Sequence, residues 1–298
     1  MTIHYGLHGS RDDLLTEVTN MPREWYAVID GAQVEDVDRK LASQRFVHTP
    51  LYFEGTDEVA IANGPFLVMV PDPSVAARLI ALTADGPSPV FWSWAGGDKN
   101  FVQHLRRKAM MRIPPEDPAQ RPAWDNVLFR HADANVLATT LEVLTPEQQA
   151  SFIGRGKVIS FYAPDALGLV VARRPIDLPK VERETISFTP QQYEQIEQNR
   201  VIRNRRRVMN YLRRTAEYLV SSWEDEKLYQ EVCEAERLGL SYGLLSEHAH
   251  WLWAWLFVWT EREIAASSDI RSAITESGYD PDLMVDHLFD RTIEALRV

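Results

Sequence analysis

Four side chains in the first half of the chain have the chemistry of acid–base catalysis and anion binding: Asp30, His104, Arg130 and Asp133. If they met in a cleft, they could bind a small substrate and move protons on it. The sequence contains no nucleophile elbow, Walker A loop, dinucleotide glycine fingerprint or His-Glu-x-x-His stretch. We therefore expect the protein not to be an enzyme. A small-molecule hydrolase or transferase that uses these four residues is the alternative.

Glu247, His248 and His250 form the densest group of residue types that bind metals. Residues two apart on a helix point to nearly opposite faces, so the two histidines are poorly placed to share one ion. Cys233 is the only cysteine, which excludes an internal disulfide and a multi-cysteine zinc site. The sequence predicts no metal and no other cofactor.

An arginine-rich stretch lies in the second half of the chain and could suggest nucleic-acid binding. Its members are Arg200, Arg203, Arg205, Arg206, Arg207, Arg213 and Arg214. The net charge of −11 argues against that function, because phosphate binding needs clustered positive charge. We expect a solvated face whose arginines pair with acidic neighbours, namely Glu194, Glu197, Glu217 and Glu224. An acidic protein partner is the other possibility, and its candidate contacts are Arg203, Arg206, Arg207 and Tyr211.

A run of apolar and aromatic residues from Trp251 to Trp259 contains four tryptophans. A helix that is apolar on all sides is normally buried in a core or covered by a partner. We expect it to be core, and we keep Trp251 and Trp255 as candidate partner contacts, because tryptophan is enriched in binding hot spots. The run has nine residues, against the roughly 20 that span a bilayer, so we expect no membrane anchor.

Composition indicates a globular protein. With 298 residues, 45% hydrophobic and 25% charged, the chain can fill a core and is long enough for two domains. The first residues lack the basic-then-apolar order of a signal peptide, and a single cysteine suits a reducing compartment. We expect a cytoplasmic protein.

Residues 1–178 are predicted to form a mixed α/β domain, in which helices flank a mixed sheet. The predicted strands are Trp25–Ile29, Leu51–Phe53, Phe66–Val70, Val90–Trp92 and Val127–Phe129, and the predicted helices are Val34–Ser43, Pro73–Leu82 and Asn100–Met111. Two prolines between Arg173 and Pro179 suggest the domain boundary.

Residues 179–298 are predicted to be all-α. A long helix from Pro190 to about Ser222, broken once at most, is followed by helices at Leu228–Leu238, Glu247–Ala265 and Pro281–Leu296. Thr145 and Thr189 are predicted N-caps, because each is followed by Pro and, three residues later, by Gln.

Five segments occur in the order of a known family's signature: Tyr26–Gln33, with the sequence Tyr-Ala-Val-Ile-Asp-Gly-Ala-Gln, then Pro50–Thr56, Gly64–Val68, His104–Arg106 and Val127–Arg130. Together they resemble the type VI secretion effector adaptor/chaperone family over about Trp25–Tyr162. Phe129–Asn135 departs from the family's Phe-Arg-x-Tyr-Asp-Pro-Arg-like motif, because it keeps Arg130 and Asp133 but lacks the Tyr, the Pro and the second Arg.

The resemblance implies a protein that works by recognition without catalysis. Such an adaptor binds the N-terminal region of a toxic effector and brings it to the C-terminal extension of the trimeric VgrG-like spike protein; it needs no cofactor, nucleic acid or membrane. The family-motif residues are Tyr26, Asp30, Gly31, Gln33, Pro65, His104, Arg106, Phe129, Arg130 and Asp133. From the residues themselves, Asp30 and Gly31 suit a tight turn. Arg130 and Asp133 suit an ion pair, and Asp133 equally suits a helix N-cap.

Overall fold

The computed structural model describes residues 2–6, 10–52, 57–84, 86–115, 124–165, 168–174, 185–276 and 278–296. Contacts between Cα atoms divide the chain into two compact units, which we call unit 1 (Met1–Arg200) and unit 2 (Val201–Val298). Within the described ranges, no helix has both the length and the apolar content needed to cross a membrane.

Unit 1 is built on an antiparallel sheet. Seven strands of the described residues form it in the order β1-β9-β8-β5-β2-β4-β3. They are β1 (Thr2–Gly6), β2 (Trp25–Asp30), β3 (His48–Pro50), β4 (Pro65–Val70), β5 (Val90–Trp94), β8 (Gly156–Ala163) and β9 (Gly168–Arg173). The central strands β2 and β5 are buried along their whole length, which explains why their sequences are mostly apolar and do not alternate with polar residues.

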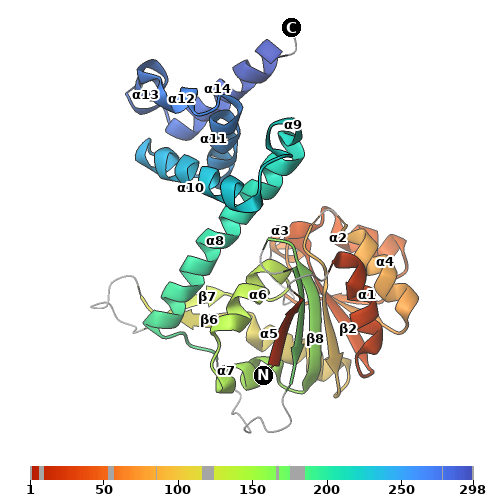
Figure 1. Ribbon diagram of the computed structural model, residues 1–298. Coiled ribbons are helices and arrows are strands. Elements are labelled where there is room, and N and C mark those ends of the chain that lie inside the picture. Colours follow the sequence, from red (N-terminus) through yellow and green to blue (C-terminus); the bar gives the residue numbers. More distant parts are fainter. Residues whose placement is uncertain are drawn as a thin grey trace. The chain divides into compact units, whose positions relative to one another are not determined.

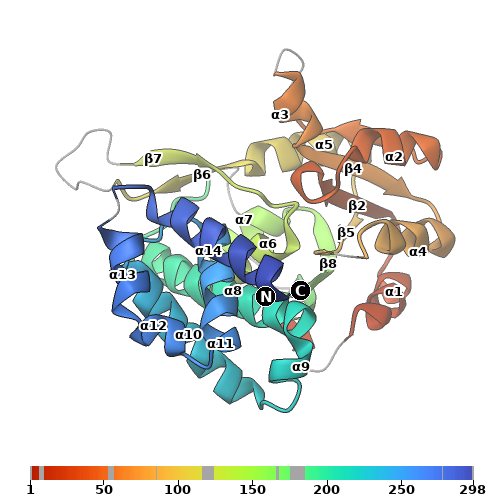
Figure 2. The same cartoon turned by 90° about the horizontal axis from the view of Figure 1, so that it is seen from above.

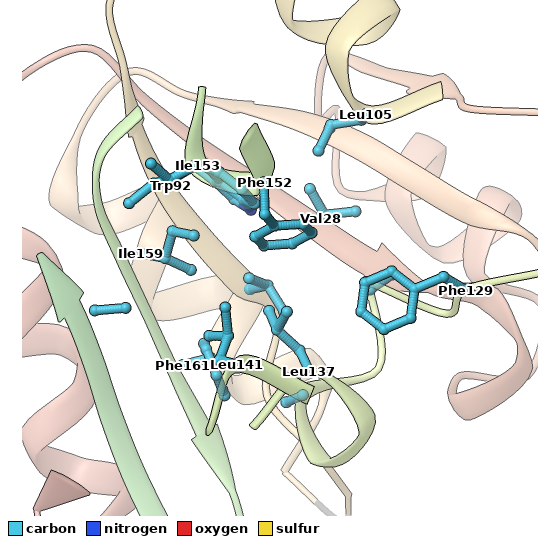
Figure 3. Packing of buried hydrophobic residues seen from close by; sticks show 14 of the residues in the cluster. Val28, Trp92, Leu105, Phe129, Leu137, Leu141, Phe152, Ile153, Ile159 and Phe161 are labelled. Atoms are coloured by element: carbon cyan, nitrogen blue, oxygen red, sulfur yellow. The ribbon is translucent and has the colours of Figure 1, made fainter. Parts of the chain in front are cut away.

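Helices cover both faces of this sheet, as Figure 1 shows. One face packs against α1 (Arg11–Asn20), α2 (Val37–Ser43) and α4 (Pro73–Leu82). The other face packs against α5 (Asp98–Lys108), α6 (Ala134–Val143) and α7 (Pro146–Ile153). In this second core, Phe152 of α7 and Leu137 of α6 lie over Val28 and Ile159 of the sheet (Figure 3). The alternation of side chains along the strands thus supplies two separate cores.

Two short strands lie outside the main sheet (Figure 2). β6 (Met110–Ile113) pairs in antiparallel register with β7 (Asp125–Leu128). The other edge of β6 is bonded to the segment around Ser187, because the Arg112 N–H donates to Ile186 and the Arg112 carbonyl accepts from Phe188. Two further short elements complete unit 1: the 3₁₀ turn η1 (Gly31–Gln33) and the helix α3 (Glu58–Ala62).

Unit 2 is helical throughout its described residues. α8 (Pro190–Thr215) begins in unit 1 and ends in unit 2. It is followed by α9 (Glu217–Val220), α10 (Asp225–Ser241), α11 (Glu247–Trp259), α12 (Glu263–Ala266), α13 (Ser268–Thr275) and α14 (Pro281–Leu296). Every residue of α11 from Leu252 to Val258 is buried, and the Trp253 indole N–H donates to the Ala235 carbonyl of α10 at 3.0 Å. The apolar run is therefore the central helix of this core.

Many predicted elements are confirmed, including the α4 bounds, the break between α8 and α9, and the all-α second half. The Thr145 capping box is present, and the Thr189 N–H and hydroxyl both bond Gln192. The predicted strand at Leu51–Phe53 lies partly outside the described residues, and β3 ends just before it.

Three predictions about the elements were wrong. Every neighbouring pair in the sheet is antiparallel, because β4 and β5, which α4 joins, do not pair with each other and are separated by β2, which is antiparallel to both. The predicted helix Asn100–Met111 ends at Lys108, and Met110 starts β6. The predicted helix Glu247–Ala265 is interrupted, because Glu261 and Arg262 have left-handed φ angles of 49° and 74°.

The predicted domain boundary at residues 178 and 179 lies outside the described residues. The two compact units divide between Arg200 and Val201, inside α8.

Candidate functional site

Asp30 is the last residue of β2 and starts the turn η1. Its Oδ1 accepts a hydrogen bond from the Ala32 N–H at 3.1 Å, as predicted for an aspartate that caps its own turn. Gly31 is required for a different reason from the one expected. A Cβ atom there would lie 2.3 Å from the Ala62 carbonyl oxygen, so the backbone after α3 excludes any side chain. The Gly31 N–H donates to the Gly64 carbonyl at 2.9 Å and joins the two segments.

Asp30, Gln33, Arg130 and Asp133 form one polar group, which we call the Asp30 cluster. Arg130 donates to Asp30 Oδ2 from both Nε (3.2 Å) and Nη2 (2.6 Å). Its Nη2 also lies 3.7 Å from Asp133 Oδ2. Gln33 donates to the same Asp133 oxygen at 3.3 Å. The cluster therefore joins the end of β2 to the start of α6, across a hundred residues of sequence.

Asp133 has both of its predicted roles, because it contacts Arg130 and also caps α6. Its Oδ1 accepts from the N–H groups of Asn135 and Val136 at 2.9 and 3.2 Å. Asp133 and Asp30 each have under a tenth of the side chain exposed, whereas the Arg130 side chain is 42% exposed. A molecule that approaches the cluster from solvent thus meets the guanidinium and not the carboxylates.

The electrostatics of Asp30 reflect its burial. Burial raises the pKa of its carboxyl above the usual 3.8, and the charge and hydrogen bonds of Arg130 offset part of that rise. Burial likewise raises the pKa of the nearby Tyr52 phenol, and the Asp30 charge adds to the effect. The cluster is therefore an ion pair on a partly dehydrated wall.

A pocket of about 330 Å³ opens beside the cluster. Its wall is mostly apolar and includes four alanines, whose small side chains leave the space open. The lining residues are Asp30, Ala32, Tyr52, Ala60, Asn63, Pro65, Ala109, Leu128, Phe129, Arg130, His131 and Ala132. A volume of this size, with one ion pair at its wall, is typical of a site for a small ligand or a large side chain.

His104 lies apart from the Asp30 cluster. It is on α5, its Nε2 lies 2.7 Å from the Phe152 carbonyl, and its ring centroid is 4.8 Å from that of Trp94. A Cβ atom on Gly154 would come within 2.5 Å of the ring, so the histidine fills a tight core position. Burial lowers its pKa to about 4, and the Phe152 carbonyl offsets this only in part. The four residues of the hydrolase alternative are thus not brought into one cleft.

The remaining motif residues of unit 1 hold segments together. Arg106 Nε donates to the Leu51 carbonyl at 2.8 Å and fixes the segment before the pocket. Pro65, the first residue of β4, lines the pocket, and its carbonyl accepts from the Leu51 N–H. The Tyr26 hydroxyl donates to Asp98 at 2.7 Å. Phe129 is buried and packs edge-on against Phe152.

The arginines of α8 pair mainly with residues of other helices. Of the predicted acidic partners, Glu197 is confirmed, with Arg200 Nε at 3.0 Å. Three other pairs are Arg205–Glu236 at 2.6 Å, Arg207–Glu247 at 3.0 Å and Arg213–Asp225 at 2.9 Å. The packing of α10 and α11 brings these carboxylates to α8, which helical spacing alone does not reveal. Arg203 and Arg206 are half-buried and have interactions of their own.

The aromatic candidates of unit 2 pack against one another. The Arg207 guanidinium lies over the Trp251 ring at 5.1 Å, and Tyr211 packs beside the same ring at 5.6 Å. Trp255 is 4% exposed, stacks on Trp259 and meets Phe289 edge-on. Trp255 is therefore a core residue, while Trp251 and Tyr211 are half-buried.

Within the described ranges, no three His, Cys, Asp or Glu side chains are grouped so that they could hold a metal ion. His248 Nε2 lies 3.6 Å from Asp286, so it faces α14. His250 instead approaches Gly239 of α10. The two histidines point to different helices, as the two-residue spacing suggested.

Sequence reasoning missed most of the pocket wall. Tyr52 lies inside the motif segment Pro50–Thr56, but its residue type suggested no role. Ala60, Asn63 and Ala109 belong to no motif, and nothing in the sequence marked them as site residues. Alanines that matter because they leave space have no pattern of their own in a single sequence. Leu128 also lies inside a motif segment, Val127–Arg130, without a role of its own, and its exposure of 53% could not be predicted from the strand pattern.

No curated protein and no solved structure matches the chain. Residues 25–151 match a family model described as a domain of unknown function (DUF4123). The matched range contains the whole Asp30 cluster and every residue that lines the pocket. The chain thus contains a match to a domain that is known in type VI secretion effector adaptor proteins.

Proposed function

We propose that this protein is a cytoplasmic adaptor that binds one type VI secretion effector and loads it onto the spike protein, by protein–protein recognition and without catalysis. The observation that carries the proposal is the domain match over residues 25–151, a domain known in effector adaptors. Four family-motif residues of this range, Asp30, Pro65, Phe129 and Arg130, line one pocket with a mostly apolar wall. An adaptor needs such an adhesive surface and no reacting group.

The arrangement of the polar residues supports recognition over chemistry. The carboxylate oxygens of Asp30 and Asp133 accept hydrogen bonds from Arg130, Gln33 and backbone N–H groups. His104 is enclosed in the core. A general base would have to reach a proton on a substrate, which these contacts do not favour. Unit 2 supplies a separate surface, which is helical. The chain therefore has two separate parts, as a molecule that bridges two partners requires.

Deletion of the gene tests the proposal. Delivery or accumulation of one effector, encoded beside this gene, should be lost, while other effectors of the same secretion system are still delivered. Complementation with the intact gene should restore delivery, and the protein should co-purify with that effector and with the spike protein. Loss of every effector would identify a component of the machine itself and would contradict the adaptor proposal.

A further inference from the structure

The pocket beside Arg130 has the features of an anchoring site for a polypeptide. Its wall is apolar apart from a few groups, and its volume of about 330 Å³ holds one large side chain. Leu128 at its rim is 53% exposed, and its partner Met110 on β6 is 41% exposed. An exposed leucine that borders an apolar pocket extends the surface that a partner can bury.

Arg130 supplies the polar contact of this site. Its Nε and Nη2 are occupied by Asp30, but no described residue accepts a hydrogen bond from Nη1. Because the side chain is 42% exposed and lines the pocket, this nitrogen is available to an incoming acceptor. Hydrogen bonds between a guanidinium group and a carboxylate are charge-assisted and stronger than those between neutral groups. The available Nη1 group at the mouth of the pocket therefore suits a carboxylate of the ligand.

The strand next to the pocket, β7, has one edge that pairs with no other described strand. The Phe129 N–H donates to Ala109, so the alternation of an antiparallel pair leaves the N–H and C=O groups of Asn126 and Leu128 pointing away from β6. The same alternation points Arg112 of β6 outward, where it bonds Ile186 and Phe188. Among the described residues, no strand pairs with the outer edge of β7. An extended segment can add to such an edge while its side chains enter adjacent pockets.

We propose that this site binds an extended, acidic segment of the spike protein, which places a large apolar side chain in the pocket and a carboxylate beside Arg130. The inference rests on the proposed adaptor function. We assign the segment to the spike because every lining residue lies within the matched domain, and a surface built by the shared domain suits the partner that adaptors share. The effector, which differs between adaptors, is then bound elsewhere.

Two residues of α3 provide a matched pair of variants. Ala60 lines the pocket, whereas Ala62 is exposed on the same helix and does not line it. Ala60→Leu fills part of the pocket, and Ala62→Leu adds the same atoms to the surface. With the full-length chain and purified spike protein, we expect Ala60→Leu to weaken binding at least about tenfold and Ala62→Leu to leave affinity within about twofold. A spike protein without its C-terminal extension should bind neither variant nor the unmodified chain.

Leu128 tests the charge of the partner independently. Its side chain is half exposed, so either charge is compatible with folding. Leu128→Asp repels an acidic segment, and Leu128→Lys attracts it; we expect the Asp variant to bind the spike at least about tenfold more weakly than the Lys variant at low salt. Effector binding should be the same for all four variants.

The outcomes separate the two proposals. If the unmodified chain binds neither spike nor effector, the adaptor function fails. If it binds the spike but Ala60→Leu equals Ala62→Leu, or Leu128→Asp equals Leu128→Lys, the pocket assignment alone is wrong. If Ala60→Leu releases the effector and not the spike, the assignment of the segment to the spike is overturned.

Discussion

The ion pair between Asp30 and Arg130 should stabilise unit 1 by a measurable coupling energy. Asp30→Asn keeps the oxygen that caps Ala32, and Arg130→Gln keeps part of the side-chain stem, so both remove charge with little loss of volume. Together with the double variant they form a thermodynamic cycle. If the residues act as the scaffold that we infer, the variants lose function only as far as they lose folding.

The magnitude follows from burial. Exposed pairs contribute about 0.2–1 kcal/mol, and breaking a fully buried pair costs about 3–5 kcal/mol. Asp30 is 6% exposed and Arg130 is 42% exposed, so the pair lies between these limits. Two unit charges about 4 Å apart gain about 4 kcal/mol at an effective dielectric constant of 20, and dehydration of Asp30 removes part of this. We expect a coupling energy of about 2 kcal/mol.

The pH dependence has a definite sign. Because burial raises the folded-state pKa of Asp30 above its unfolded value of 3.8, the folded state binds more protons between the two values. The contribution of Asp30 to the free energy of unfolding is therefore present at lower pH and falls as pH rises through that window. Arg130→Gln removes a group that lowers this pKa, so the fall should extend to higher pH. Asp30→Asn should abolish it.

Urea unfolding of the four chains gives the cycle, and hydrogen exchange of β2 amides assigns the transition to unit 1, since two units need not unfold together. A coupling energy below about 0.5 kcal/mol would show that the pair is too hydrated to matter. Variants that stay folded and bind both partners, but lose a measurable turnover of some substrate, would refute the scaffold interpretation and reveal an enzyme.

Three further predictions concern other parts of the chain. Burial lowers the pKa of both His104 and His131 to about 4, so the unfolded state takes up protons first as pH falls below about 6.5. Protonation of each ring should therefore cost up to about 3 kcal/mol of stability by pH 4. The variant His131→Leu should lose less stability than the unmodified chain between unfolding measurements at pH 7 and at pH 5. Arg207→Glu should lower the free energy of unfolding by about 1 kcal/mol, because the new carboxylate repels Glu247 and the contact with Trp251 is lost. The control Arg214→Glu, at an exposed position of the same helix, should change that free energy by less than about 0.5 kcal/mol in thermal unfolding. Trp255→Ala should cost about 3–5 kcal/mol in unit 2, and retention of near-wild-type stability would show that this ring is not core.

Local sequence signals predicted the helices of this protein better than its sheet. The α4 helix could be located because Asp72 caps it and Pro73 follows the cap, and both signals are local. The strands β8 and β9 carry weaker signals: β8 mixes buried apolar residues with Ser160, which is fully buried. Their place in the sheet depends on pairing with β5 and with β1, and such long-range pairing leaves no period in one sequence.

The candidate site shows the same division. The sequence suggested an ion pair between Arg130 and Asp133, and the structure has that contact at 3.7 Å together with a closer one, at 2.6 Å, to Asp30 a hundred residues away. Asp133 was correctly expected as a cap because Val136 and Leu137 follow it in a helix. What could not be predicted is the pocket, since it results from alanines on η1, on α3 and at the C-cap of α5 whose only contribution is small size.

The contrast between the two halves bears on how an adaptor could keep one partner and change the other. In unit 1, the motif residues are tied to one another by close packing, as where Gly31 meets the Ala62 carbonyl, so few substitutions there leave the pocket intact. In unit 2, the pairs of α8 with Glu247 and Asp225 involve carboxylates that are more than half exposed, and surface pairs of this kind cost little to replace. A helical surface held in this way can be changed without loss of the core around α11. Under the proposed adaptor function, we therefore expect a variable effector to be recognised by unit 2 and a shared spike by unit 1.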